Sequence, residues 1–149
     1  MNLSEHFTLK EMTVSQAASR LGIRNEPNAD QIKALRLLCE KVLEPVRAHF
    51  AAPVIVTSGF RSPRVNTAIK GSATSQHCRG EAADFHVHGV SDLDVAQYLL
   101  KHLNYDQLIL EYPPNGWVHV SYSAHRTRNM ELTAKRIKGR TVYLGGLRP

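Results

Sequence analysis

The sequence predicts an α+β fold, with helices in the first part of the chain and a small antiparallel sheet in the second. Three observations indicate this class. Apolar residues recur at three- and four-residue spacing before residue 50, β-branched runs begin only after Pro53, and Tyr112–Gly116 is a dense turn between two such runs. Helices that precede a cluster of strands pack on one face of an antiparallel sheet.

The composition fits one domain with its own core. The chain has 149 residues, of which 42% are apolar and 21% are charged, the balance of a soluble globular protein. We expect a single domain over residues 1–149, with its core at about 6–122 and a basic hairpin or tail at 123–149. No apolar stretch reaches the roughly 18 residues of a membrane span, and we expect a monomer.

Three helices are predicted before the first strand. Asn28 can cap the longest one, whose apolar stripe runs from Ile32 to Val46. Pro45 lies inside this stripe and should kink or restart the helix, because proline removes a backbone donor. The two shorter helices are expected at residues 8–12 and 14–21.

Strands are predicted where β-branched and apolar residues form short runs bounded by turn residues. Ser91 and Asp94 form the pattern of a capping box for one more helix, expected over residues 92–103. A last hairpin is expected within residues 136–144, around Lys138–Arg140. The other strands are expected at residues 54–57, 82–87, 107–111 and 117–122.

The charge balance favours an anionic partner but does not distinguish between classes of partner. Nineteen Lys and Arg against thirteen Asp and Glu give a net charge of +6, which suits nucleic acid, an acidic lipid surface or an acidic wall polymer. The sequence lacks a recognition-helix pattern, zinc-finger spacing and interleaved basic and aromatic residues, so no specific nucleic-acid partner is expected. Cys39 and Cys78 form no paired motif, and we expect both as free thiols.

The densest polar constellation combines a loop histidine with two strand residues. His77 lies in a glycine-punctuated loop, Asp84 lies on the strand after it, and His119 alternates with Trp117 on a later strand. Two imidazoles and one carboxylate, with one position left open for water, are a ligand set that catalytic zinc sites use. The alternative is a solvated loop histidine beside a capping or paired aspartate.

These motifs resemble those of the zinc peptidases of the D-alanyl-D-alanine carboxypeptidase type, which are grouped with lysostaphin-like peptidases and the hedgehog signalling domain. The likeness covers about residues 6–122 and includes the Ser58-Gly59-Phe60-Arg61-Ser62 segment and Asn66. It implies a zinc site in a cleft on the sheet, and a peptidoglycan peptide as substrate. It also implies that one zinc ion is held by His77, Asp84 and His119.

Zinc chemistry of this kind also needs a general base. Zinc lowers the pKa of bound water toward about 7, and a carboxylate must take the proton and return it to the leaving amine. Many members of the family carry an acid three positions before the last histidine ligand, where this chain has Gly116. We therefore predict that Glu111 pairs across the hairpin with Trp117 and acts as the base. The alternative is a surface acid at a strand end, because turn geometry fixes the register.

Other polar residues near these motifs are candidates for substrate contacts. Arg61 suits a substrate carboxylate or a developing oxyanion, in a catalytic and a binding role, or else a structural ion pair. Ser75 and Gln76 are candidates to orient substrate or to support His77. Trp117 is expected to contact substrate from the strand face that carries His119.

The leading hypothesis is thus a zinc metallopeptidase that hydrolyses peptidoglycan stem or cross-link peptides, as a D,D-carboxypeptidase or an endopeptidase. The chain is basic and begins without a signal peptide, and in this it resembles phage endolysins or prophage lysis proteins. The resemblance implies that the protein is made in the cytoplasm, is released through a holin-type pore and acts at the bacterial wall. The alternative is a non-catalytic, zinc-containing module of the same fold that binds the wall or its peptides.

Overall fold

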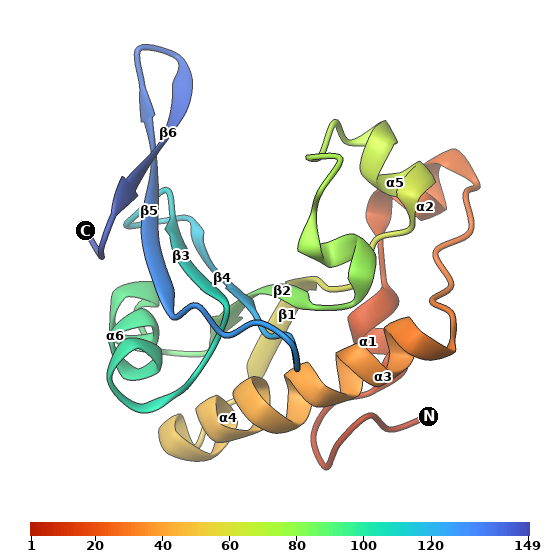
Figure 1. Cartoon of the computed structure of the whole chain (residues 1–149), viewed down its shortest axis with the longest axis horizontal. Helices are drawn as coiled ribbons and strands as arrows, with labels where there is room; N and C mark the ends of the chain where they lie inside the picture. The colour runs from red at the N-terminus through yellow and green to blue at the C-terminus, as the bar shows by residue number, and fades with distance from the viewer.

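A single six-stranded sheet organises the molecule, and the computed structural model describes all of residues 1–149. The strands lie in the order β1-β2-β4-β3-β5-β6 (Figure 1). They span Val54–Ser58, Ala82–Val87, Gln107–Glu111, Trp117–Ser121, Met130–Ile137 and Arg140–Gly145, as β1 to β6 in turn. The α+β class predicted from the sequence is confirmed.

The sheet is mixed rather than wholly antiparallel, because β3 and β5 pair in parallel. Strand β4 ends beside the start of β3, where Leu108 pairs with Val120. The chain then steps past that end of β3 and begins β5 at Met130, which pairs with Gln107. Since β5 begins at the same end as β3, the two strands run in the same direction. The predicted last hairpin is present as β5–β6, although β5 begins before residue 136.

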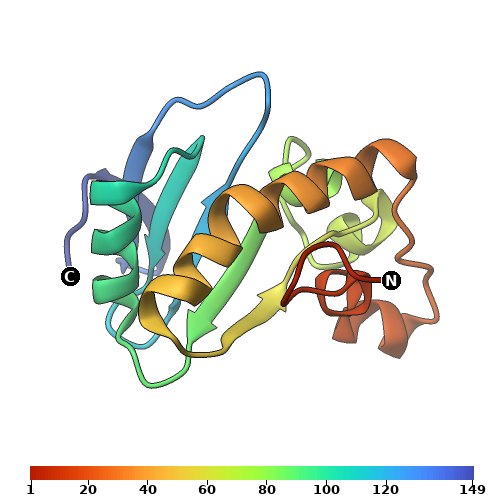
Figure 2. The ribbon, with the colours of Figure 1, turned by 90° about the horizontal axis from the view of Figure 1, so that it is seen from below.

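Six α-helices accompany the sheet. The longest helical stretch joins α3 to α4 through a π-helical turn at Cys39–Leu43, and Figure 2 shows it crossing the sheet as one rod. Pro45 lies in the first turn of α4, so the predicted restart occurs there, where a missing backbone donor costs least. The helices are α1 Leu9–Thr13, α2 Gln16–Leu21, α3 Ala29–Leu38, α4 Glu44–Phe50, α5 Pro63–Ala68 and α6 Asp92–His102.

The hydrophobic core lies on one face of the sheet. Phe85, Leu108 and Val118 project from β2, β3 and β4 into a cluster of buried residues that also contains Leu35 of α3 and Leu99 of α6. Alternate residues of a strand point to opposite faces, so the neighbours of these apolar residues line the other face. The helices leave that second face available for a functional site. No helix has the length and apolar character needed to cross a membrane.

Two short elements were not predicted. Helix α5 begins after Ser62, whose hydroxyl accepts a hydrogen bond from the Val65 amide at 3.3 Å. The Ser62-Pro63 pair is a helix-start signal, because proline is favoured in a first helical turn. A 3₁₀ turn at Gln76–Arg79 follows Ser75, which caps it in the same way.

Candidate functional site

His77, Asp84 and His119 converge on the sheet face opposite the core. Asp84 of β2 and His119 of β4 are directly paired across the sheet, and the 3₁₀ turn presents His77 to them. Asp84 Oδ1 lies 2.9 Å from His119 Nδ1 and 3.3 Å from His77 Nε2. One donor atom from each residue lies within 4.8 Å of the others. The residues predicted as metal ligands are therefore brought together.

A backbone contact orients the His77 ring. His77 Nδ1 donates a hydrogen bond to the Gly59 carbonyl at 2.7 Å, which leaves the lone pair of Nε2 directed at Asp84. Two acceptors that face each other require a proton or a cation between them. A histidine whose second nitrogen donates to a carbonyl is the usual arrangement around a bound metal.

The electrostatics of the three residues favour the forms that bind a metal. Burial lowers the pKa of His77, so its imidazole stays neutral near pH 7. Burial alone would raise the pKa of Asp84, but its interactions with His119 and His77 outweigh this effect and hold the pKa below its usual value. A neutral imidazole and an ionised carboxylate are the forms that coordinate divalent ions.

Glu111 lies on the same face as His119. It ends β3 and pairs with Trp117, while Ile109 pairs with His119, so the predicted register across the hairpin is confirmed. Glu111 is 9% exposed, and burial raises the pKa of its carboxyl group to about 7. A carboxyl group with this pKa can accept and return a proton at neutral pH.

Arg61 borders the same cleft beside the turn that carries His77. Its Nη2 donates to Ser75 Oγ at 3.3 Å, and its backbone amide donates to the His77 carbonyl at 3.2 Å. Its Nη1 makes no hydrogen bond within the protein and is not among the buried unpartnered atoms, so this nitrogen remains a donor for a ligand. Desolvation by burial lowers the pKa of Arg61, a shift that the Asp84 charge opposes.

Gln76 and Trp117 also line the cleft, but their polar atoms differ in availability. Gln76 Nε2 donates to Asp106 Oδ2 at 2.7 Å, so this amide nitrogen is already used within the protein. The buried Trp117 Nε1 has no partner. Trp117 thus offers its ring to the cleft, whereas Gln76 links the His77 turn to the start of β3.

Sequence reasoning missed the contribution of the last hairpin to this cleft. The cleft has a volume of about 410 Å³ and is lined by Tyr143 of β6 as well as by Tyr112. Glu111 pairs with Ala134, and Ala134 pairs with Tyr143, so the small alanine lies between the carboxylate and the tyrosine. Burial and the nearby Glu111 raise the pKa of Tyr143. The alternation of β5 and β6 was the available signal, but it did not reveal which strand they join.

The donor set, its neutral histidine and its ionised aspartate fit a divalent metal, and with Glu111 beside them they define a candidate metallohydrolase site. The family model described as Peptidase M15 matches residues 5–121, and the chain belongs to this family of metal-dependent peptidases. The match covers the three candidate ligands and Glu111 and ends before β5. A comparison with curated proteins gave no match.

Proposed function

We propose that the protein is a zinc-dependent hydrolase of peptide bonds in peptidoglycan stems or cross-links. The observation that carries this proposal is the convergence of His77, Asp84 and His119 on one sheet face, with the buried Glu111 in the same cleft. Membership of the Peptidase M15 family supports the reaction class. Peptidoglycan as the substrate is proposed in addition to this reaction class.

The three ligands would hold the ion, which supplies positive charge that acidifies water and polarises a carbonyl. Glu111 would accept a proton on its carboxylate and return it to the leaving amine, as its pKa of about 7 permits. Arg61 would donate to a substrate oxygen from its Nη1, which makes no hydrogen bond within the protein, and Trp117 would contact the substrate through its ring. Both side chains are held by the fold before substrate arrives, which favours stabilisation of developing charge.

The glycine at position 116 does not indicate loss of a base. A Cβ atom there would lie 1.6 Å from the Glu111 carbonyl oxygen, so this hairpin excludes any side chain at that position. The same hairpin places Glu111 on the face of the metal ligands. A non-catalytic binding module is therefore the less favoured function, and retained zinc without hydrolysis would support it.

We further propose that the protein acts at the bacterial cell wall, as an endolysin-like enzyme released by a holin-type pore. The support is the net charge of +6 and the basic side chains on β5 and β6, among them Arg136 and Arg140. Such charge attracts a protein to anionic wall polymers.

Mass spectrometry of muropeptides tests the proposal. Purified peptidoglycan is digested by the zinc-loaded protein, with a chelator-treated sample as control. Loss of a terminal D-Ala indicates a carboxypeptidase, and a split cross-link or a cut within the stem indicates an endopeptidase. Unchanged muropeptides with the loaded protein would refute the enzyme function.

A further inference from the structure

A second pocket adjoins the candidate metal site and has no assigned role. Its volume is about 600 Å³, and none of the nine side chains that line it is hydrophobic. Thr74, Gln76 and Gln107 line both this pocket and the metal cleft. The two spaces are therefore consecutive parts of one groove, and a peptide that reaches the metal ligands can extend into the second pocket.

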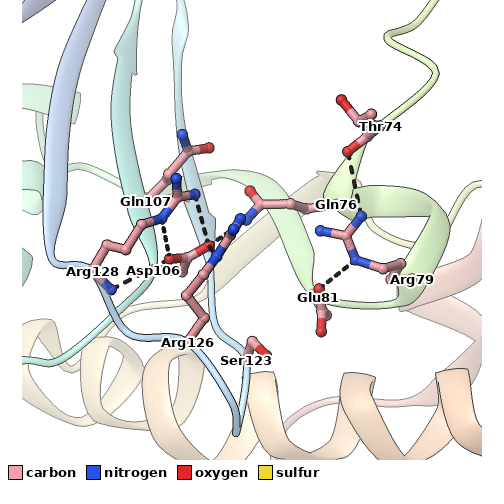
Figure 3. A pocket seen from close by; sticks show the side chains of 9 residues that line it. All are labelled: Thr74, Gln76, Arg79, Glu81, Asp106, Gln107, Ser123, Arg126 and Arg128. Carbon is pink, nitrogen blue, oxygen red and sulfur yellow. Dashed lines mark hydrogen bonds and ion pairs between the residues drawn. The ribbon is translucent and has the colours of Figure 1, made fainter.

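A buried carboxylate organises this pocket. Asp106 is 1% exposed and accepts from Arg128 Nε at 2.7 Å and Arg128 Nη2 at 3.1 Å. It also accepts from Gln76, and Arg126 Nε lies 3.4 Å away. Figure 3 shows Arg128, Arg126 and Gln76 converging on Asp106, with Arg128 on the side opposite Gln76. The carboxylate is enclosed by these partners, so it aligns the arginines rather than meeting a ligand.

The arginines keep donors that Asp106 does not use. Arg126 approaches Asp106 through Nε alone, so its two terminal nitrogens have no protein partner. Nη1 of Arg128 is also unpartnered, since this side chain uses Nε and Nη2. Their side chains are 54% and 34% exposed. Planar guanidinium groups with free parallel donors match a carboxylate.

The opposite wall of the pocket is already neutralised. Arg79 Nε donates to Glu81 at 2.8 Å, and its Nη1 donates to the Thr74 carbonyl at 3.4 Å. With Arg79 paired to Glu81, the positive charge that remains available comes from the Arg126–Arg128 pair. This charge lies on the loop between β4 and β5, beyond the end of the family match at residue 121.

We propose that Arg126 and Arg128 form a specificity subsite that binds a side carboxylate of the peptide substrate in the pocket adjoining the metal cleft. The inference rests on the proposed function, since it takes the occupant of the groove to be a stem peptide. Such peptides carry a carboxylate beside their γ-linked glutamyl bond, free in some walls and amidated in others. The subsite favours the free form, because an amide offers one acceptor and no charge to the two guanidinium groups.

Kinetics on a matched pair of synthetic stem peptides test the subsite. The two peptides differ only in whether the glutamyl carboxylate is free or amidated. We expect the zinc-loaded protein to favour the free carboxylate by about tenfold in kcat/KM, mostly through KM, as a partly exposed charged contact provides. In Arg126→Gln and in the Arg126→Gln/Arg128→Gln double variant, this preference should fall toward one.

Two further variants separate binding from folding and charge. Arg20→Gln removes the same charge from an exposed side chain of α2 and should keep the full preference. Arg126→Gln leaves both Arg128 bonds to Asp106 in place, so this variant tests the subsite even where the double variant fails to fold. Equal kcat/KM for the two peptides with the unmodified protein would overturn the subsite and leave the peptidase function standing.

Binding measurements test the arginine subsite where hydrolysis of the two peptides does not. If the loaded protein hydrolyses neither peptide, hydrolysis of single stems is excluded, and the muropeptide digest decides whether the protein cuts cross-links. Fluorescence anisotropy of the labelled peptides then measures binding alone. Tighter binding of the free carboxylate that is lost in Arg126→Gln would support the subsite, and equal binding would overturn it. The variants could also lose their attachment to purified anionic wall polymer while their preference between the two peptides stays the same. This result would assign the arginines to wall binding and contradict the proposal.

Discussion

Glu111 is the residue whose environment most clearly differs from that of an ordinary surface acid. Its burial at the end of β3 raises its pKa to about 7, and no hydrogen bond or ion pair engages its side chain. We predict that Glu111→Gln keeps zinc and lowers kcat by about 10²- to 10⁴-fold, the usual contribution of a general base. Metal content is measured by atomic absorption, and turnover by muropeptide release.

A matched variant controls for the loss of a negative charge. Glu40 is exposed, lies in the π-helical turn and makes no hydrogen bond, so Glu40→Gln should keep full turnover. Undiminished activity in zinc-loaded Glu111→Gln would remove Glu111 from the catalytic role.

Asp106 permits a prediction about stability and pH. Burial alone would raise its pKa, but hydrogen bonds from Arg128 lower it below 3.8. A carboxyl group whose pKa is lower in the folded state stabilises the fold above its unfolded pKa, and this stabilisation is lost as the pH falls through the folded value. We expect Asp106→Asn to cost about 2–4 kcal/mol at pH 7.

Urea unfolding of metal-free samples at pH 7 and pH 3 measures this effect. The difference between the unmodified protein and Asp106→Asn should shrink at pH 3, where the unfolded carboxyl group is protonated. A difference that is the same at both pH values would show that the ionised form of Asp106 does not stabilise the fold.

At the level of secondary structure, the β3–β4 hairpin couples the fold to the site. A Cβ atom on residue 116 would lie 1.6 Å from the Glu111 carbonyl oxygen and 2.7 Å from its carbonyl carbon. Gly116→Ala must therefore displace backbone, and we expect it to cost about 3 kcal/mol and to lower turnover by moving Glu111.

Gly145→Ala is the appropriate comparison, because a Cβ atom at that position of β6 meets nothing within 4 Å. Its effect on the free energy of unfolding should stay within about 0.5 kcal/mol. Denaturant unfolding curves of both variants provide the test, and equal stabilities would contradict the close approach at Gly116.

The elements differ in how far local sequence determines them. Strand β2 and the β3–β4 hairpin were predicted closely, because turn residues and β-branched runs mark their ends, and the register of Glu111 against Trp117 followed. Strand β5 was predicted too short, since its charged, alanine and methionine residues have weak strand propensity. Its parallel pairing with β3 depends on contacts distant in the chain, which no local pattern encodes.

The site shows the same division between local and long-range information. The convergence of the candidate ligands could be predicted because His77, Asp84 and His119 occur in recognisable motifs. Tyr143 could not, since it reaches the cleft only through the β5–β6 pairing. Gln76 was predicted to orient substrate or to support His77, and its amide nitrogen donates to Asp106, a partner that no local pattern indicates.

Considered as a whole, the molecule keeps its core and its candidate metal site on opposite faces of one sheet. The core helices pack against β2, β3 and β4 without using any of the three ligands. The candidate ligands come from the 3₁₀ turn, β2 and β4, so a bound metal would link the His77 turn to the sheet. Metal removal should therefore leave the protein folded but less stable.

We predict that zinc raises the midpoint of thermal unfolding. An ion that binds only the folded state, at a free concentration about 1,000 times its Kd, adds about 4 kcal/mol to the free energy of unfolding. Calorimetry with chelator, and then with zinc restored, measures the shift without reference to activity. His119→Gln should abolish the shift, because it removes one of the three converging donors. His88→Gln changes an exposed histidine outside the cluster and should retain the shift in full. A zinc response of equal size in both variants would place the bound metal elsewhere on the protein.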